Sequence, residues 1–413
     1  MRSITARLVV LLVVVTAART AAAQQRSEQD HWTVRAAMVY TAAGAPIEKG
    51  SVAIADGKIA AVGGGGGGDV LEVAAVTPGL IDLSIEIDTG NCSVEQSSEV
   101  AAALSVADSL DLFSYEWDRA LRSGVTTALA VPADFDVVGG LGVVLKTGGP
   151  PTLEARLVRG DAVLRGAIGT QPSSGNSMPH FSAPQSFYYR RPTTRMGVEW
   201  VFRKFFWDTL QGEGADDERT ADDQTVARRV LKGDLPLSIR ARATQDVRTA
   251  IYLKEEFGIP RVILHDAVEA WREPELLVRS KVAVVLPPIP PDGRVEDGFV
   301  NDSYFVPLDA AKKLADLHVP FALSGQSNAT VGTRIADQAG LAQRGGLSFE
   351  AALAAVTIEP ARMVGVQDRV GSIEVGKDAD LVLWSGKPFE PTSRIVGVLL
   401  NGRLMIDPRA ETR

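Results

Sequence analysis

The chain has 413 residues, a formal net charge of −8 and one cysteine, Cys92. Its length exceeds that of one average domain and suits a large barrel, alone or with a smaller companion domain. The acidic balance gives no support to a nucleic-acid partner, and a lone cysteine excludes an intramolecular disulfide.

The N-terminal segment has the three parts of a secretory signal peptide. Arg2 and Arg7 precede the apolar run 8–18, and a small-residue stretch, 21–23, comes before Gln24. A membrane anchor is the alternative, but it needs about 18 apolar residues. We therefore predict a signal peptide over 1–23 and export to the bacterial periplasm or medium, and the mature chain then carries a charge near −11 because three arginines leave with the signal.

Residues 31–76 are expected to form short strands and turns. Strand-like runs cover 33–40, 50–54 and 58–62, and Asp56-Gly57 between two of them predicts a tight hairpin. The glycine run 63–68 predicts a surface loop, and it lacks the Lys-Ser/Thr ending of a nucleotide-binding loop.

The C-terminal end has the same character. Residues 371–384 and 395–402 contain strand and turn residues, and Asn401-Gly402 predicts a second hairpin. Two β-rich ends around a long middle suggest that 24–76 and 366–413 meet in one small β-sandwich.

The middle of the chain, 77–365, alternates apolar strand-like runs with helical stretches, which favours an α/β fold with a parallel sheet. Expected strands are 80–87, 125–131, 163–169, 237–241, 262–265, 282–286 and 321–324, with 141–146 an ambiguous eighth, and expected helices include 244–257, 308–317 and 348–357. This count approaches an eight-stranded barrel, in which functional residues lie at the C-terminal ends of the strands.

Several separated blocks resemble the amidohydrolase superfamily. They are Val76-Thr77-Pro78-Gly79-Leu80-Ile81-Asp82, Ser123-Gly124-Val125-Thr126-Thr127, residues 191–197, residues 357–362 and, most specific, residues 370–382. The resemblance runs from about Val34 to Met405. It implies a (β/α)8 TIM-like barrel with a composite β-sandwich built from both termini, and a secreted hydrolase of C–N bonds other than peptide bonds.

The same resemblance implies one or two zinc-like divalent ions, held by imidazoles and carboxylates, that lower the pKa of a bound water toward ~7. The first barrel strand of the family ends in a His-x-His pair, and here Ser84 and Glu86 stand at those places. The last strand should supply an aspartate, where this chain has Gln326. These ligands are therefore replaced.

Family ligands are also replaced at the central strands. Related chains have a second His-x-His pair where Arg240 and Arg242 stand, and a bridging lysine aligns with Arg165. Only His265, followed by Asp266, matches a family ligand. We expect no cofactor, although Glu86 and His265 could share one weakly held ion.

The histidine count supports this without any alignment. The chain has four histidines; His31 and His318 are expected away from the strand ends, and His180 lies in a Ser/Pro-rich loop. A standard two-metal site is not available from this set.

Arginine at former ligand positions has an electrostatic logic. We hypothesise that Arg240, with Arg165 or Arg242, occupies the metal space and pairs with Glu86, while Asp266 lines the same pocket. The alternative is that these arginines face the barrel wall or solvent. His265 is interpreted as a buried neutral remnant rather than a catalytic group, and Lys146 with the glycines 139–142 as a loop near the mouth or a hairpin.

Two functions remain open. One is a hydrolase of C–N bonds, metal-free or with one ion through Glu86 and His265, with Gln326 at the vestigial last-strand position. The other is a pseudoenzyme: a binding protein for a small molecule, or the silent subunit of a hetero-oligomer with an intact amidohydrolase. The loss of ligands favours the second, because function depends on the site and not on the barrel.

Overall fold

The computed structural model describes residues 31–85, 93–95, 97–173, 191–214, 217–289, 294–296, 303–325 and 334–409. The predicted signal peptide lies outside these ranges, as do Glu86, Cys92, His180 and Gln326. Within the described chain, no helix is both long and apolar enough to cross a membrane. The chain divides into two compact units, one holding 31–78, 372–388 and 393–409, the other the described parts of 79–371 together with 389–392.

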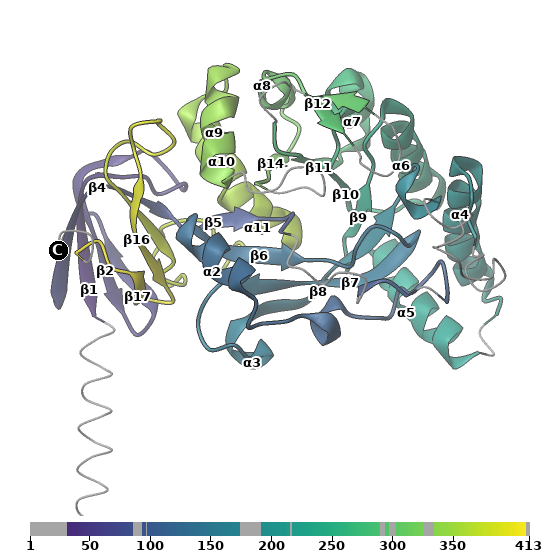
Figure 1. The fold of residues 1–413 in the computed structure, drawn as a ribbon, viewed down its shortest axis with the longest axis horizontal. Helices are drawn as coiled ribbons and strands as arrows, with labels where there is room; N and C mark the ends of the chain where they lie inside the picture. Colours follow the sequence, from purple (N-terminus) through teal and green to yellow (C-terminus); the bar gives the residue numbers. More distant parts are fainter. Residues whose placement is uncertain are drawn as a thin grey trace, which may run out of the picture. The chain divides into compact units, whose positions relative to one another are not determined.

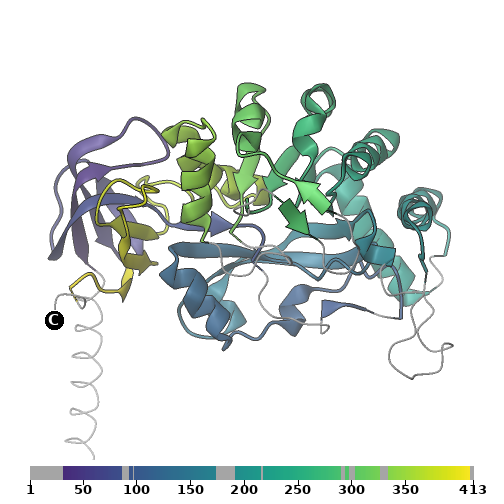
Figure 2. The same cartoon turned by 45° about the horizontal axis from the view of Figure 1, so that its top comes forward.

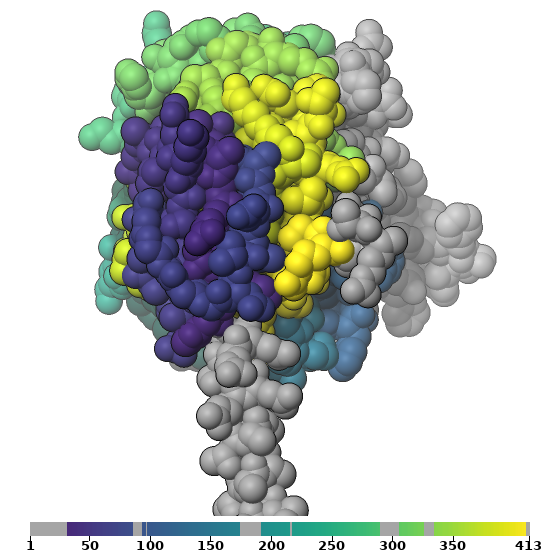
Figure 3. Space-filling model, turned by 90° about the vertical axis from the view of Figure 1, so that its left-hand side faces the viewer, coloured from purple at the N-terminus to yellow at the C-terminus, as the bar shows by residue number. Residues whose placement is uncertain are grey.

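The first unit is one seven-stranded sheet made by both ends of the chain (Figure 1). In the space-filling view, N-terminal residues (purple) and C-terminal residues (yellow) lie next to each other on one face (Figure 3). Its order is β17-β16-β15-β4-β1-β2-β3, so the C-terminal strands join the N-terminal ones where β15 pairs antiparallel with β4. The strands are β1 Trp32–Val39, β2 Ile47–Ala55, β3 Lys58–Val62, β4 Asp69–Pro78, β15 Leu381–Trp384, β16 Ile395–Leu400 and β17 Arg403–Ile406. The two ends therefore meet as expected, but as one continuous hydrogen-bonded sheet.

Both predicted hairpins are confirmed in this sheet. Asp56-Gly57 joins β2 to β3 and Asn401-Gly402 joins β16 to β17, and all four residues have positive φ values, between 48° and 76°. Positive φ at both central positions is what a two-residue type I′ turn requires. A Cβ on Gly402 would lie 2.9 Å from the Cα of Gly57, so the two turns pack directly on each other.

The second unit contains an eight-stranded sheet in the order β14-β11-β10-β9-β8-β7-β6-β5 (Figures 1 and 2). Its strands are β5 Leu80–Asp82, β6 Val125–Ala130, β7 Val138–Lys146, β8 Leu157–Ala167, β9 Leu237–Arg240, β10 Val262–His265, β11 Ala283–Leu286 and β14 Phe321–Leu323. A short pair, β12 Arg294–Glu296 and β13 Ser303–Phe305, lies outside this sheet. The expected TIM-like α/β barrel is confirmed.

Helices cover this sheet. They are α2 Tyr115–Arg122, α3 Leu153–Arg156, α4 Arg195–Gln211, α5 Glu218–Lys232, α6 Thr244–Phe257, α7 Pro274–Ser280, α8 Ala310–Asp316, α9 Ile335–Arg344, α10 Phe349–Ala355 and α11 Ile358–Val364. The expected helix 244–257 matches α6 at both ends, because Asp246 caps its start and Gly258 ends it in the left-handed conformation.

Two details of the barrel differ from the expectation. The ambiguous run 141–146 belongs to β7, which is antiparallel to both β6 and β8, so the (β/α)8 alternation is interrupted there. The first barrel strand ends at Asp82 rather than continuing to Ile87. After Asp82 the strand is not continued by backbone pairing, and the Asp82 side chain accepts hydrogen bonds instead. The run of glycine and valine in β7 carries no sequence signal for strand direction.

The ladder between the two outermost strands, β5 and β14, is replaced by other contacts. The Ile81 N–H donates to the Val356 carbonyl at 2.9 Å, beside the start of α11. At the other end of the strands, the Gly325 N–H donates to Asp82 Oδ2 at 2.9 Å. We call this place, between β5 and β14, the seam.

Candidate functional site

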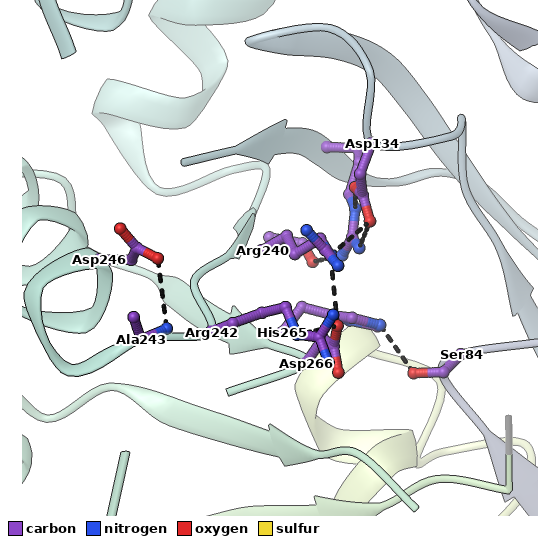
Figure 4. Close-up of polar contacts among 10 residues, drawn as sticks. Ser84, Asp134, Arg240, Arg242, Ala243, Asp246, His265 and Asp266 are labelled. Atoms are coloured by element: carbon purple, nitrogen blue, oxygen red, sulfur yellow. Dashed lines mark hydrogen bonds and ion pairs between the residues drawn. The ribbon is translucent and has the colours of Figure 1, made fainter. Parts of the chain in front are cut away.

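Polar side chains converge at the C-terminal ends of the barrel strands (Figure 4). Ser84 follows β5, Asp134 follows β6, Arg240 ends β9 and His265 ends β10. Parallel strands bring their carboxyl ends to one edge of the sheet, so residues distant in sequence meet there. Most of these side chains are buried, which makes each charge among them energetically significant.

Asp134 is the centre of one half of the site. Its two oxygens accept from Nε and Nη2 of Arg165, at 2.7 and 2.9 Å. The remaining terminal nitrogen, Nη1, of the same arginine donates to the Ser238 hydroxyl at 3.0 Å. A bidentate guanidinium–carboxylate pair of this kind fixes both planes, and here the arginine side chain is only 3% exposed.

Asp266 is the centre of the other half. Its Oδ2 lies 3.2 Å from Nε of Arg240 and 3.3 Å from Nε of Arg242. Arg240 also reaches Asp134 Oδ2 at 3.4 Å, so the two halves are joined. We call Asp134, Arg165, Arg240, Arg242 and Asp266 the arginine cluster.

The backbone helps to aim Asp266. Its φ is +50°, a left-handed conformation that L residues seldom adopt, although aspartate tolerates it better than most. This conformation comes directly after β10, and the carboxylate of Asp266 faces the Nε atoms of Arg240 and Arg242 (Figure 4).

His265 lies beside the cluster and bonds to the first strand. Its Nε2 is 2.7 Å from the Ser84 hydroxyl, while its Nδ1 has no hydrogen-bond partner within the described chain. Burial, and then the charges of Arg165 and Arg240, hold the pKa of His265 well below its usual value. The imidazole is therefore neutral.

A serine hydroxyl on a neutral imidazole has the geometry of a nucleophile and its base. Two features weaken that role. A base with a strongly lowered pKa accepts protons poorly near neutral pH, and no described side chain orients the ring through Nδ1. The contact of His265 with Ser84 is better understood as a buried hydrogen bond that links β10 to the segment after β5.

Asp82 lies two residues before Ser84 and holds the seam. Its Oδ1 accepts from the Ser84 N–H and its Oδ2 from the Gly325 N–H, both at 2.9 Å. Burial raises the pKa of Asp82 to about 6, although both backbone hydrogen bonds act in the opposite direction. Its charge therefore changes near neutral pH.

The predicted site residues can now be placed. Ser84, Arg165, Arg240, Arg242, His265 and Asp266 come together at the strand ends. Glu86 and Gln326, and with them the hypothesised pairing of Arg240 with Glu86, lie outside the described residues. Lys146 does not lie at the mouth: it pairs with Thr127 near the opposite end of β6, in a buried strand rather than a loop. His31 and His318 are exposed and lie elsewhere.

Two members of the site were missed by the sequence reasoning, Asp134 and Asp82. Asp134 belongs to the loop between β6 and β7, and the signal was available, since acidic residues directly after a barrel strand lie at the functional end. Asp82 is part of a block that resembles the family. Nothing in the sequence around Asp82 predicts that its carboxylate would take the place of a backbone ladder between two strands.

Comparison with known proteins agrees with this architecture. A family model described as the amidohydrolase family matches residues 308–405. The amidohydrolase tasK of Hapsidospora irregularis is 25% identical over 306 residues, which cover 69% of this chain but 31% of that protein. A solved amidohydrolase from Thermotoga maritima superposes with a TM-score of 0.77 and 27% identity, over 91% of this chain and all of the other. These matches support membership of the amidohydrolase superfamily.

A further solved structure and a further curated protein are also similar to this chain. A zinc-bound adenosine deaminase from Xanthomonas campestris shares the fold, with a TM-score of 0.54 and 17% identity over 92% of this chain and 93% of its own. A 60-residue stretch, 14% of this chain, is 47% identical to the urease alpha subunit of Yersinia enterocolitica and covers 10% of that subunit. This chain thus spans about a third or less of the curated relatives it matches.

The described residues at these strand ends do not fit a divalent metal. Among them, no three His, Cys, Asp or Glu side chains converge on one point. The guanidinium groups of the arginine cluster offer no lone pair, and the carboxylates of Asp134 and Asp266 already contact them. A cation entering this place would meet three fixed positive charges.

Proposed function

We propose that this amidohydrolase has lost metal-dependent hydrolysis of C–N bonds and keeps its barrel as a scaffold for binding. The observation that carries the proposal is the arginine cluster, which fills the strand ends where superfamily members hold metal. Family membership alone would favour a hydrolase, but the fold does not supply the reaction without the site.

Charge provides the physical argument. A metal site needs lone-pair donors around a cavity with negative or neutral character. Here Arg165, Arg240 and Arg242 are each 3% exposed, so their charges are poorly screened by water. Asp134 and Asp266 offset two of the three and are held by them.

Metal analysis of the purified protein tests the proposal directly. We expect far less than one equivalent of zinc, manganese or iron per chain after dialysis against metal-containing buffer. We also expect no chelator-sensitive turnover of amides, dipeptides or cyclic ureas. One equivalent of zinc together with turnover that a chelator abolishes would overturn the proposal.

Restoring ligands gives a sharper test. The double substitution Arg240→His with Arg242→His returns a His-x-His pair beside His265 and Asp266, and we expect it to bind zinc in near-stoichiometric amount. The matched control, Arg240→Met with Arg242→Met, removes the same charges without adding ligands and should bind none. Equal zinc binding by both variants would show that the arginines do not determine metal affinity.

A silent subunit paired with an intact amidohydrolase stays a prediction from the sequence. It rests on the same loss of ligands. Purification of the native protein from its source, followed by identification of any histidine-complete amidohydrolase in stoichiometric amount, would test it.

A further inference from the structure

Helix α4 carries a row of exposed apolar side chains. Met196 is 79% exposed, Trp200 50%, Trp207 56% and Leu210 56%. Figure 1 shows this helix at the edge of the barrel unit, with α6 beside it. Large apolar side chains exposed singly are ordinary, but a contiguous row of them marks an interaction surface.

The spacing of the row is that of a coiled-coil seam. With Arg203 between the two tryptophans, the positions 196, 200, 203, 207 and 210 advance by four, three, four and three residues. This 3-4 alternation places all five on one stripe of a 17-residue helix. We call it the α4 seam.

The α4 seam is distinct from the face of the helix that packs on the barrel. The buried residues of α4 are Val198, Val201, Phe202, Phe205, Phe206 and Thr209. Phe202 and Phe206 are fully buried, so the inner face is satisfied by the core. The helix is therefore apolar on two sides. On the outer side the Arg191 guanidinium lies over the Trp200 ring, 5.6 Å from its centroid, while Met196, Trp207 and Leu210 are each more than half exposed.

The residues that flank the α4 seam carry opposite charges. In heptad notation Trp200 and Trp207 occupy position a, and Arg203 occupies position d. Glu199 is then at position g and Lys204 at position e. In a parallel two-stranded coiled coil, each g residue faces the e residue five places later on the other helix. Glu199 of one copy would then face Lys204 of the other, twice.

We propose that the α4 seam joins two copies of this chain as a parallel, two-fold symmetric homodimer. The charge pattern favours this occupant, because the helix is complementary to itself in that register. Glu199 and Lys204 are partly exposed, with side chains 35% and 49% accessible. Within the chain Glu199 pairs with Arg203 and accepts from the Thr249 hydroxyl, and Lys204 pairs with Asp208. Arg203, paired with Glu199 and Glu256, contributes its aliphatic stem at the d position.

The area is sufficient for a reversible dimer. The four apolar side chains offer on the order of 500 Å² per copy, against the ~800 Å² that each partner of a standard interface buries. The polar flanks supply the remainder. Tyr252 on α6, 49% exposed, adds an aromatic side chain on the helix to which Glu256 and Arg203 tie α4.

Sedimentation equilibrium of the full chain tests the dimer. Between about 1 and 200 µM we expect a monomer–dimer equilibrium, and Trp207→Ala should weaken it by at least about tenfold because tryptophans dominate such interfaces. The control Phe113→Ala with Tyr115→Ala removes aromatics that are 81% and 71% exposed but off the seam, and should leave it unchanged. A monomer at every concentration, or a dimer that Trp207→Ala does not weaken, would overturn the proposal.

Register and orientation are tested separately. Leu210→Cys in a Cys92→Ser background should form a disulfide-linked dimer under mild oxidation, since equivalent d positions meet only in the parallel arrangement. Glu199→Lys and Lys204→Glu should each weaken the dimer, and together should restore it to within about threefold of the original. Absence of the disulfide, or singles that behave like the double variant, would rule out this geometry.

Discussion

Two buried carboxylates at the same end of the barrel are stabilised in opposite ways. Asp82 at the seam accepts from two backbone N–H groups, and burial raises its pKa to about 6. Asp134 in the arginine cluster accepts from a guanidinium through both oxygens. The difference shows that backbone amides can position a buried carboxylate without securing its charge, whereas a guanidinium brings a full countercharge.

The largest loss of stability should follow from removal of the carboxylate that pairs with Arg165. Asp134→Asn leaves Arg165 buried without its carboxylate, and we expect a loss of about 3–5 kcal/mol in the free energy of unfolding, measured in urea. The control Asp161→Asn removes an ion pair with Arg229 whose side chains are 42% and 38% exposed, and should cost no more than about 1 kcal/mol. Similar losses in the two variants would mean that the cluster is not held by its ion pairs.

The seam should respond to pH instead. The folded pKa of about 6 lies above the ordinary value of 3.8, so between these values the folded chain holds a proton that the unfolded chain has released. Stability therefore falls as pH rises through this window, by up to about 3 kcal/mol from Asp82 alone.

The comparison of wild type with Asp82→Asn isolates that contribution, because the amide does not titrate. The variant carries a constant penalty, since its NH2 group meets a backbone donor. A difference between the two proteins that does not change from pH 4.5 to pH 7 would show that Asp82 is not the titrating group.

His265 should make the free energy of unfolding change with pH in the opposite direction to Asp82. Its folded pKa is lowered by burial and by Arg165 and Arg240, so the unfolded chain gains a proton that the folded chain refuses as pH falls below about 6.5. Stability should decrease toward acid, at most by about 1.4 kcal/mol per pH unit. Nitrogen NMR of the ring should show neutral imidazole well below that pH, and a protonated signal near pH 6 would contradict the assignment.

The smallest effect belongs to the hydrogen bond that joins the two regions. Ser84→Ala removes the partner of His265 Nε2 and should cost about 1 kcal/mol, measured as a shift of the urea midpoint without a change in slope. Ser123→Ala, which loses a hydroxyl bond to the Ala120 carbonyl at the end of α2, provides a control away from the site. A neutral Ser84→Ala with a costly control would show that the hydroxyl is dispensable.

Local features of the fold were predictable from the sequence. Asp56-Gly57 and Asn401-Gly402 specify their turns because only a few residues adopt positive φ readily. The helix over 244–257 has its own stop signal in Gly258. These elements need no information from elsewhere in the chain.

The site was predictable only in part. Arg240, Arg242 and His265 follow strand-like runs, so their place at the functional end could be inferred from the barrel pattern. Their partners could not, because Asp134 is 106 residues from Arg240 in sequence and meets it only when β6 and β9 are in place. Direction was also hidden for β7, since antiparallel and parallel buried strands have the same composition.

The seam leaves two strand edges that bear on association of the folded chain with other molecules. Edge strands with unpaired backbone groups are templates for pairing with other molecules. Here both strands at the seam, β5 and β14, are three residues long, and Ile81 and Asp82 already engage the segments around Val356 and Gly325. Such short edges offer little template, so the open side of this sheet resists aggregation by its brevity rather than by charge.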